Sequence, residues 1–372
     1  MLTIDTPIVL ERPPTIYFGA GAIGKLGEWI AKHAYRHPCV IADPFLQAQL
    51  DSLGLGVVQS FTGIRGEPDI PMLQAAVAAA RGCDVIIGYG GGSVMDVAKL
   101  VAVMQNGFPD LADISGLNRA PKRTVGLVQI PTTAGTGSEA GTRALITDPE
   151  SLGKIATESP QMLADLAIID PQVMLSVPSA VTVATGVDAM AHCVEAYTSR
   201  RAHPLIDDYA VRGIELVGKY LQRAVENGGD AEARSGMALA AFYGGLCLGP
   251  VNTTAGHALS YPLGTRCKIP HGLANALIFP HTLAINQAAQ ATKTARIGKA
   301  LGFEAHDHDS TFNGAYAFCA NLGLQMRLRD HGVEENALAA MAAEAHAIRR
   351  LLDWNPVELS EADILGIYGN AF

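Results

Sequence analysis

Four residues in the second half of the chain have the types and spacing of metal ligands. Asp188 and His192 stand in the string DAMAH, and a spacing of four places both side chains on one helical face. His257 and His271 lie fourteen positions apart in sequence punctuated by Gly and Pro, which is typical of a loop feeding a helix. One carboxylate and three imidazoles suit a borderline divalent ion such as Fe(II) or Zn(II). Because the chain has 11 histidines, ordinary polar residues are the alternative interpretation of the spacing alone.

A glycine-rich turn in the first half of the chain has the character of a phosphate-binding loop. A buried apolar run ends in Gly90, Gly91, Gly92 and Ser93, where a helix is expected to begin. Glycines let backbone amides approach a ligand closely, and the helix N-terminus adds partial positive charge. The turn follows neither the GxGxxG nor the Walker pattern, so plain turn chemistry is the alternative.

Two further segments are consistent with nucleotide binding. The string IPTTAGTGSE at 130–139 follows another predicted strand and is dense in hydroxyls and glycines, although a solvated loop has the same composition. Asp43 closes the apolar run CVIAD. An acid at the end of a second Rossmann-type strand accepts hydrogen bonds from a ribose 2′-hydroxyl and repels a 2′-phosphate, which favours NAD over NADP. A helix N-cap is the other reading of Asp43, and one residue can do both.

The elements that must position these residues differ between the two halves of the chain. Up to position 178, short β-branched runs alternate with amphipathic helical patterns, which predicts a mostly parallel, doubly wound sheet. The segment at 143–148 could instead form part of an antiparallel hairpin. The expected strands are 38–43, 56–61, 84–89, 124–130 and 167–170, and the expected helices are 23–33 and 72–81.

After position 178 strands almost vanish from the pattern. Apolar residues recur at three- and four-residue intervals, which predicts helices. We therefore expect an α/β dinucleotide-binding, Rossmann-like domain at 1–178 and an all-helical domain at 179–372. The expected helices are 204–227, 231–248, 273–288, 292–301, 311–322, 335–349 and a Ser-capped helix at 360–371.

Composition narrows the class of protein. At 372 residues the chain exceeds the ~250–300 at which a single core usually stops growing, so two domains are expected. A net charge of -9 argues against a nucleic-acid partner, and six cysteines without a CxxC spacing indicate reduced thiols in a cytosolic protein. The N-terminus lacks a signal-peptide pattern, and the longest apolar stretch is shorter than the ~20 residues of a membrane span. We expect a soluble, cytoplasmic protein without a membrane partner.

Five blocks together resemble one family, the iron-dependent (group III) alcohol dehydrogenases. They occur in the family's order and extend the resemblance over nearly the whole chain. The blocks are YFGAGA at 17–22, GGGSVMDVAK at 90–99, PTTAGTGSE at 131–139, ATGVDAMAH at 184–192 and PHGLANA at 270–276.

The resemblance implies a role for each matching position. Asp188, His192, His257 and His271 match the family's metal ligands, with Fe(II) expected and Zn(II) as the alternative. NAD is the implied cofactor, with Gly90 to Ser93 at its pyrophosphate, Asp43 at its adenosine ribose, and Thr132, Thr133 and Ser138 in the segment that lines it. Lys154 resembles the lysine that reaches the nicotinamide-side ribose. The family's architecture, like that of dehydroquinate synthases, joins a Rossmann-like domain to an all-helical one.

The implied reaction moves a hydride between NAD(H) and a primary alcohol or aldehyde, or another small hydroxy compound. The metal acts as a Lewis acid on the substrate oxygen, with His271 among its ligands. A small-molecule substrate and a homo-oligomer, a dimer or larger, follow from the same resemblance.

One departure from the family lies beside the site. Many members have a second histidine four residues after the position of His257, and this chain has Tyr261 there. A phenol can donate hydrogen bonds but is a poorer proton relay near neutral pH than an imidazole. Tyr261 is thus a candidate catalytic residue, or it only shapes the pocket.

Other members of the superfamily remain alternatives. The string around Tyr261 is also similar to hydroxyacid–oxoacid transhydrogenases, whose acidic substrates need a cation, with Arg143 and Arg266 as candidates. Maleylacetate reductases share the fold. A more distant alternative is a metal- and NAD-dependent lyase.

Overall fold

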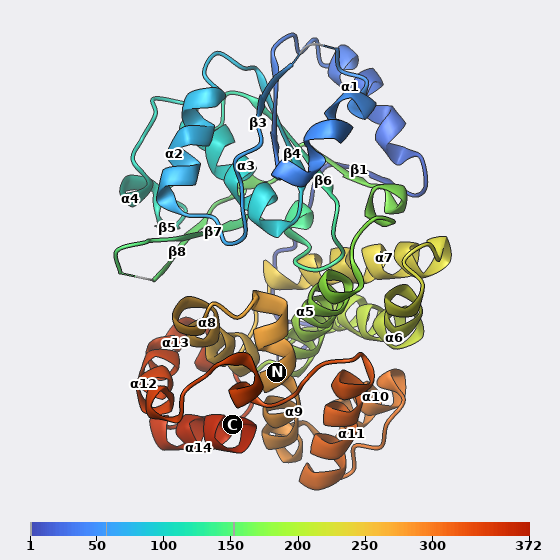
Figure 1. Ribbon diagram of the computed structural model, residues 1–372, viewed down its shortest axis with the longest axis vertical. Coiled ribbons are helices and arrows are strands. Elements are labelled where there is room, and N and C mark those ends of the chain that lie inside the picture. The colour runs from blue at the N-terminus through green and yellow to red at the C-terminus, as the bar shows by residue number, and fades with distance from the viewer. Residues whose placement is uncertain (1, 57, 152) are drawn as a thin grey trace. The chain divides into compact units, whose positions relative to one another are not determined.

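The computed structural model describes residues 2–56, 58–151 and 153–372 (Figure 1). Contacts divide the chain into two compact units. The α/β unit is Leu10–Val177, and the helical unit combines residues 2–9 with Pro178–Phe372. Each unit has buried hydrophobic residues of its own.

The first residues of the chain belong with the helical unit, whereas the sequence grouped them with the α/β domain. The backbone N–H of Leu2 donates to the carbonyl of Ala202 at 2.9 Å, and Nε2 of His203 lies 3.1 Å from the carbonyl oxygen of Thr6. These long-range contacts carry no local sequence signal, so a pattern of local periodicities could not reveal them.

The α/β unit is built on parallel strands, as predicted. Among the described residues, six strands pair in the order β1-β9-β6-β4-β2-β3, all parallel. A second sheet, β5-β8-β7, contains the antiparallel pair β7–β8, which confirms the hairpin expected at 143–148. The predicted strand at 56–61 includes position 57, which lies outside the described residues. The strands are β1 (Thr15–Phe18), β2 (Pro38–Ala42), β3 (Gln59–Phe61), β4 (Val85–Gly90), β5 (Gly116–Leu117), β6 (Gly126–Pro131), β7 (Arg143–Thr147), β8 (Lys154–Glu158) and β9 (Leu166–Ile169).

Helices cover both faces of the main sheet because alternate strand residues point to opposite sides. In β2, Cys39 and Ile41 face the core beneath α2 and α3, whereas Val40 and Ala42 face the core beneath α1. This two-sided burial explains why the strands are nearly continuous apolar runs. The helices of this unit are α1 (Leu26–Lys32), α2 (Ile70–Ala79), α3 (Gly92–Met104) and α4 (Leu111–Ile114).

The second unit is helical throughout its larger part, as predicted. Helix α5 lies at its centre and packs against α6, α7 and α9, so nearly every residue in its second half is buried. Ser360 caps the last helix, whose capping box it forms with Asp363. The helices are α5 (Ser179–Thr198), α6 (Pro204–Glu226), α7 (Ala231–Leu248), α8 (Ala255–Cys267), α9 (His271–Asn286), α10 (Ala291–Leu301), α11 (His308–Asn321), α12 (Leu338–Ala347), α13 (Arg349–Leu352) and α14 (Glu361–Ala371).

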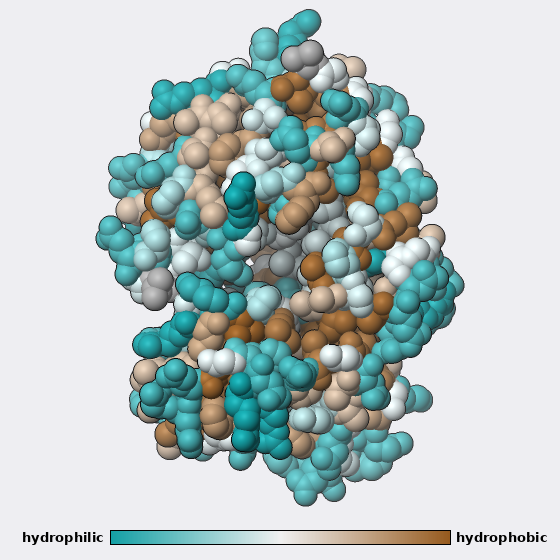
Figure 2. Space-filling model, viewed as in Figure 1, coloured by the Kyte–Doolittle hydropathy of each residue, from teal (hydrophilic) through white to brown (hydrophobic). Residues whose placement is uncertain are grey.

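The outer helices of this unit are one-sided. In α10 the buried positions Thr294, Ile297, Gly298 and Leu301 recur at helical intervals, and most of the remaining positions are exposed. Hydrophilic side chains accordingly dominate the visible surface over α10 and α11 (Figure 2). None of the helices in the described part of the chain is long and apolar enough to span a bilayer.

One prediction about this unit was wrong. The segment after His257 forms helix α8, with Pro262 inside it, where the sequence predicted a loop. Proline removes one backbone hydrogen bond from a helix interior. Eight of the helix's first nine residues are buried, and we attribute the helix to this packing, which offsets the lost bond.

Candidate active site

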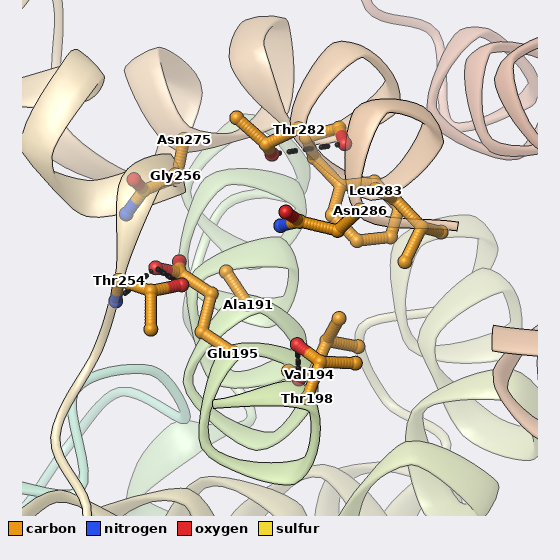
Figure 3. Close-up of a pocket in the computed structure, with 11 residues that line it drawn as sticks. Ala191, Val194, Glu195, Thr198, Thr254, Gly256, Asn275, Thr282, Leu283 and Asn286 are labelled. Carbon is orange, nitrogen blue, oxygen red and sulfur yellow. Dashed lines mark hydrogen bonds between the residues drawn. The ribbon is translucent and has the colours of Figure 1, made fainter. Parts of the chain in front are cut away.

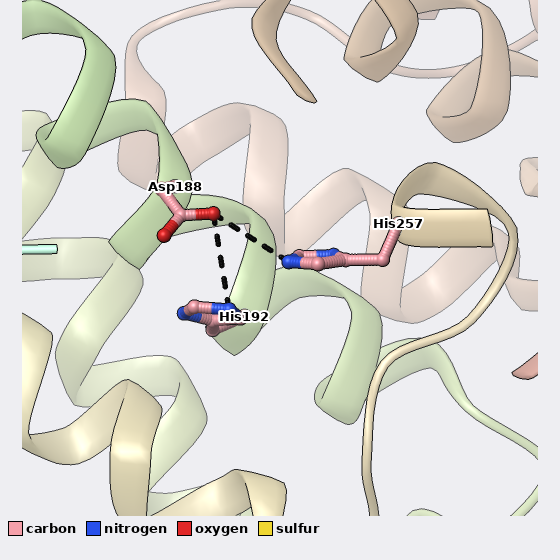
Figure 4. Close-up of side chains that lie close together, drawn as sticks. All are labelled: Asp188, His192 and His257. Atoms are coloured by element: carbon pink, nitrogen blue, oxygen red, sulfur yellow. Dashed lines mark ion pairs between the residues drawn. The ribbon is translucent and has the colours of Figure 1, made fainter. Parts of the chain in front are cut away.

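Helix α5 positions the first two predicted metal ligands. Because 3.6 residues make one turn, Asp188 and His192 project from the same face, and Oδ1 of Asp188 lies 3.8 Å from Nε2 of His192 (Figure 4). Both side chains are buried. The four-residue spacing in DAMAH therefore places the two side chains on one helical face, as predicted.

The two distal histidines reach the same carboxylate from α8 and α9. Nε2 of His257 and Nε2 of His271 each lie 3.5 Å from Oδ1 of Asp188. The approach of α9 to α5 depends on Gly272, since a Cβ there would lie 2.0 Å from the carbonyl oxygen of Ala184. A glycine next to His271 is thus a packing requirement of the site.

Three of the four predicted donor atoms cluster closely enough for a single divalent ion, and the fourth approaches the same carboxylate oxygen. The ligand atoms of Asp188, His192 and His257 all lie within 4.8 Å of one another, and His271 joins them through the same carboxylate oxygen. Donors held at about 2.1 Å from one ion in a tetrahedron lie roughly 3.5 Å apart. The three distances from Oδ1 of Asp188 to the imidazole nitrogens, 3.5 to 3.8 Å, match that spacing, and the donor set suits Fe(II) or Zn(II).

The side chains of Asp188, His192, His257 and His271 form a cage, and the first two have protonation states that suit a cation. Burial alone would raise the pKa of Asp188, but the surrounding imidazoles lower it far below its ordinary value, so the carboxylate is ionised. Burial lowers the pKa of His192 to about 4, which leaves its ring neutral near pH 7. An ionised carboxylate and a neutral imidazole are the protonation states that a metal ion requires. His257 differs: burial would lower its pKa, but the charge of Glu195 and the hydrogen bonds to Asp188 and Glu195 raise it to about 10, so a bound ion would have to displace a proton from this ring.

Glu195 is a functional residue that the sequence analysis missed. Its Oε1 accepts a hydrogen bond of 2.6 Å from Nδ1 of His257, and its Oε2 accepts from the backbone N–H and the hydroxyl of Thr254. Burial alone would raise the pKa of Glu195, but the charge of His257 and these hydrogen bonds lower it. A carboxylate on Nδ1 orients the ring, and once the ring is neutral it keeps the proton on Nδ1 and the Nε2 lone pair toward Asp188.

Asn275, one turn after His271 on α9, was also missed. Its Nδ2 donates to Oδ1 of Asp188 at 2.7 Å and lies 3.2 and 3.3 Å from Nε2 of His257 and His271. Because Nδ2 is close to three corners of the cage, the amide caps the face that those three ligands form. The sequence did contain a positional clue to Asn275, because a residue four positions after His271 lies on the same face of the helix.

A small internal cavity lies behind these two residues (Figure 3). Its lining includes Glu195, Thr254, Asn275 and Asn286. Its volume of about 10 Å³ is close to the least that one water molecule needs, so it is too small for a substrate. The cavity is thus lined by Glu195 and Asn275, the two residues that contact the predicted metal ligands.

Tyr261 lies beside the cage, as the sequence predicted. Its ring centroid is 5.8 Å from that of His271. The two arginines that could have bound an acidic substrate are both paired elsewhere, Arg143 with Glu158 and Arg266 with Glu344.

The predicted phosphate loop lies where β4 meets α3. Gly90 ends the strand, Gly91 is the N-cap, and Gly92 and Ser93 open the helix. The segment at 130–139 packs directly on this turn, since a Cβ on Gly92 would lie 2.5 Å from Cγ2 of Thr136. The structure therefore brings together two segments that the sequence analysis singled out separately as nucleotide-binding signals.

The hydroxyl-rich segment at 130–139 is held in place by contacts of its own residues with the glycine-rich turn and with α3. Thr132 donates its backbone N–H to the carbonyl of Gly90 at 2.9 Å, and a Cβ on Gly91 would lie 3.3 Å from Oγ1 of Thr133. Ser138 is buried, and its hydroxyl lies between Asp96 at 2.6 Å and Nζ of Lys99 at 2.7 Å. The Ser138 side chain thus links this segment to α3 rather than pointing out of it.

The two other predicted cofactor residues lie at element ends. Asp43 follows β2 and accepts a hydrogen bond of 2.9 Å from the backbone N–H of Phe45, so the N-cap reading holds. Lys154 opens β8, and its Nζ contacts Glu67 and the hydroxyl of Thr147.

Family models match both halves of the chain. The iron-containing alcohol dehydrogenase model matches residues 13–171, and the model for the C-terminal part of the same family matches residues 182–372. Together they cover the turn at Gly90 and all four members of the cage.

Related proteins and solved structures match this chain along nearly its whole length. The chain is 36% identical to long-chain-alcohol dehydrogenase 1 of Geobacillus thermodenitrificans, over 97% of this chain and 95% of the relative. The structure of a 1,3-propanediol oxidoreductase superposes with a TM-score of 0.94 at 29% identity, covering 99% and 100% of the two chains. A sulfoacetaldehyde reductase from Bifidobacterium kashiwanohense, solved with NAD+, gives 0.89 at 28% identity, covering 98% and 99%. The chain therefore belongs to the iron-containing alcohol dehydrogenases, a family of NAD-dependent, metal-containing oxidoreductases.

Proposed function

We propose that Asp188, His192, His257 and His271 hold one divalent metal ion and that the protein oxidises a primary alcohol, or reduces the aldehyde, with NAD(H). The observation that carries the proposal is the cage itself, in which three imidazole nitrogens lie 3.5 to 3.8 Å from one buried carboxylate oxygen. The bound ion would supply a Lewis acid for the substrate oxygen, and NAD would supply the hydride acceptor.

The residues around the cage prepare it for that chemistry. Glu195 holds His257 with its Nε2 toward the cage, and Asn275 holds the carboxylate of Asp188. Of the four ligands, His271 is the most accessible, with 29% of its side chain exposed against 3 to 5% for the other three. Substrate would accordingly approach on the side of His271, where Tyr261 lies.

Tyr261 is placed to orient the substrate. A phenol 5.8 Å from the ring of His271 can donate a hydrogen bond to a hydroxyl bound beside that ligand. In this proposal the proton of the alcohol passes to water rather than through a second histidine.

The nucleotide half of the proposal rests on the turn between β4 and α3. The backbone N–H groups from Gly91 to Ser93 would bind the pyrophosphate at the helix N-terminus. Thr132 and Thr133 would line the nucleotide, and Asp43 would accept hydrogen bonds from the adenosine ribose. Ser138 would act indirectly by anchoring its segment, and Lys154 would reach the second ribose by exchanging its contact with Glu67. A homo-oligomer and a cytoplasmic location remain predictions from the sequence.

The test measures NADH formation and metal content on the same protein preparations. Wild-type protein loaded with Fe(II), and separately with Zn(II), is given NAD and a panel of alcohols, diols and hydroxyacids. His271→Ala is expected to lose both the ion and turnover, while the exposed His306→Ala, paired with Glu304, keeps both. Stoichiometric NADH from an added alcohol would exclude a lyase. Full activity in a His271→Ala protein shown to be metal-free would contradict the proposal.

A further inference from the structure

A positively charged side chain, Arg350, is separated from the most exposed member of the cage by one aromatic ring. The Tyr261 ring contacts two side chains: its centroid is 5.8 Å from that of His271 and 5.7 Å from Cζ of Arg350. These residues come from α8, α9 and α13 of the helical unit. They form a continuous run from the most exposed metal ligand to a surface guanidinium.

Arg350 differs from the arginines around it, because no carboxylate among the described residues neutralises it. Its neighbour Arg349 pairs with Asp353, and Arg266 on α8 pairs with Glu344. Within the part of the chain that the structure describes, no carboxylate forms an ion pair with Arg350. The chain has 36 acidic and 27 basic residues, so an arginine without a carboxylate here is not explained by a shortage of acids.

An arginine in this situation is suited to bind an anion. The guanidinium offers five N–H donors in a planar fork that matches a carboxylate, and it is always charged near neutral pH. Contact with the face of an aromatic ring restrains the planar group without using its N–H donors. The Tyr261 ring thus supports Arg350 while leaving its donors available to a ligand.

We propose that Arg350 binds an anionic group at the far end of the substrate, and that the preferred substrates are short hydroxy acids and the corresponding oxo acids. The inference rests on the proposed function, because the substrate hydroxyl must lie at the metal cage. The alcohol carbon gives a hydride to NAD+ and the hydroxyl gives a proton to water, which leaves a carbonyl group and NADH. The carboxylate takes no part in this exchange and keeps its charge on both sides of the reaction.

The test compares substrates of equal length that differ in charge. We would measure kcat/KM of the metal-loaded enzyme for 4-hydroxybutyrate and for 1,4-butanediol, in wild type, Arg350→Gln, Arg350→Lys and Arg349→Gln. Arg349 is the matched control, because it lies next to Arg350 on α13 and has its own carboxylate partner. Hydroxymethyl compounds carrying a sulfonate or a phosphate separate the kinds of anion.

The acid-to-diol ratio of kcat/KM is expected to fall about 10- to 100-fold in Arg350→Gln, the range of a lost charge-assisted hydrogen bond. Most of the loss should appear in KM, Arg350→Lys should recover part of the ratio, and Arg349→Gln should leave it unchanged. Equal ratios in wild type and Arg350→Gln would overturn the inference. If no alcohol of either charge reduces NAD, the proposed function fails, and calorimetric titration of 4-hydroxybutyrate into the same two proteins still decides whether Arg350 binds the anion.

Discussion

Nδ1 of His257 lies 2.6 Å from Oε1 of Glu195, and both side chains are buried. The Glu195 carboxylate accepts the hydrogen bond from Nδ1 of His257, and Nε2 of the same ring faces Asp188. Two buried carboxylates, Asp188 and Glu195, therefore serve the cage, one directly and one through a histidine. Their combined charge balances that of a divalent ion.

Glu195→Gln is expected to weaken metal binding while preserving the fold. Glutamine keeps the shape and one acceptor but removes the negative charge, and loss of such a partner typically costs about 10- to 100-fold in metal affinity. Competition with a chromogenic chelator measures the affinity. Glu215→Gln on α6 is the control, since Glu215 forms an exposed ion pair with Arg212 on the same helix. Equal affinity in Glu195→Gln and wild type would show that Glu195 has only a packing role.

Asn275→Leu is expected to destabilise the metal-free protein. The amide donates to Asp188 and lies close to two imidazole nitrogens, whereas leucine is similar in size and offers no donor. Leaving a buried charged acceptor without this donor costs about 1–3 kcal/mol. Thermal unfolding of metal-free samples gives the difference, with Asn313→Leu on the exposed side of α11 as control. Identical melting temperatures for metal-free Asn275→Leu and wild type would contradict the proposed capping of the cage.

The cage shows which parts of a candidate site a sequence pattern can predict. Asp188 and His192 are one helical turn apart, so their spacing alone placed them together. His257 and His271 meet them through the packing of α8 and α9 on α5, and only the family resemblance tied them to the same ion. Glu195 and Asn275 have the right helical spacing but are residue types common on any helix surface, so burial had to be known before they stood out.

The fold divides in the same way. Alternating strand and helix patterns were sufficient to predict a parallel sheet followed by helices, because burial on both faces makes each strand apolar along its length. Helix α8 was missed because Gly and Pro are local signals for a loop, and packing with the rest of the helical unit outweighed them. The strand order and the attachment of residues 2–9 depend on long-range contacts with no local pattern.

Gly92→Ala is expected to impair both folding and NAD binding. The added Cβ would lie 2.5 Å from Cγ2 and 2.7 Å from Oγ1 of Thr136, so the hydroxyl-rich segment must shift. Overpacking of this kind costs about 1–3 kcal/mol. Denaturant unfolding and calorimetric titration with NAD measure the two effects.

The control for this substitution is Gly27→Ala on α1, where an added Cβ meets no atom within 4 Å. Alanine in an exposed helix is favoured over glycine by about 1 kcal/mol, so that variant should be slightly more stable and bind NAD normally. Normal NAD affinity in Gly92→Ala would separate the turn from the nucleotide site.

Glu139→Gln is expected to make the protein's stability less dependent on pH. Glu139 is buried near Lys99, and among the described residues its Oε2 has no hydrogen-bond partner. Burial raises its pKa from 4.5 to about 7, although the charge of Lys99 opposes the shift. The folded protein therefore binds more protons than the unfolded chain between these two values, and the free energy of unfolding falls as the pH rises through that window.

Above pH 7 the full cost of an ionised, buried carboxylate is present. Glutamine has no such cost, so the melting temperature of Glu139→Gln relative to wild type should rise between pH 5 and pH 8. A constant difference across that range would mean that Glu139 is already ionised in the folded protein at pH 5.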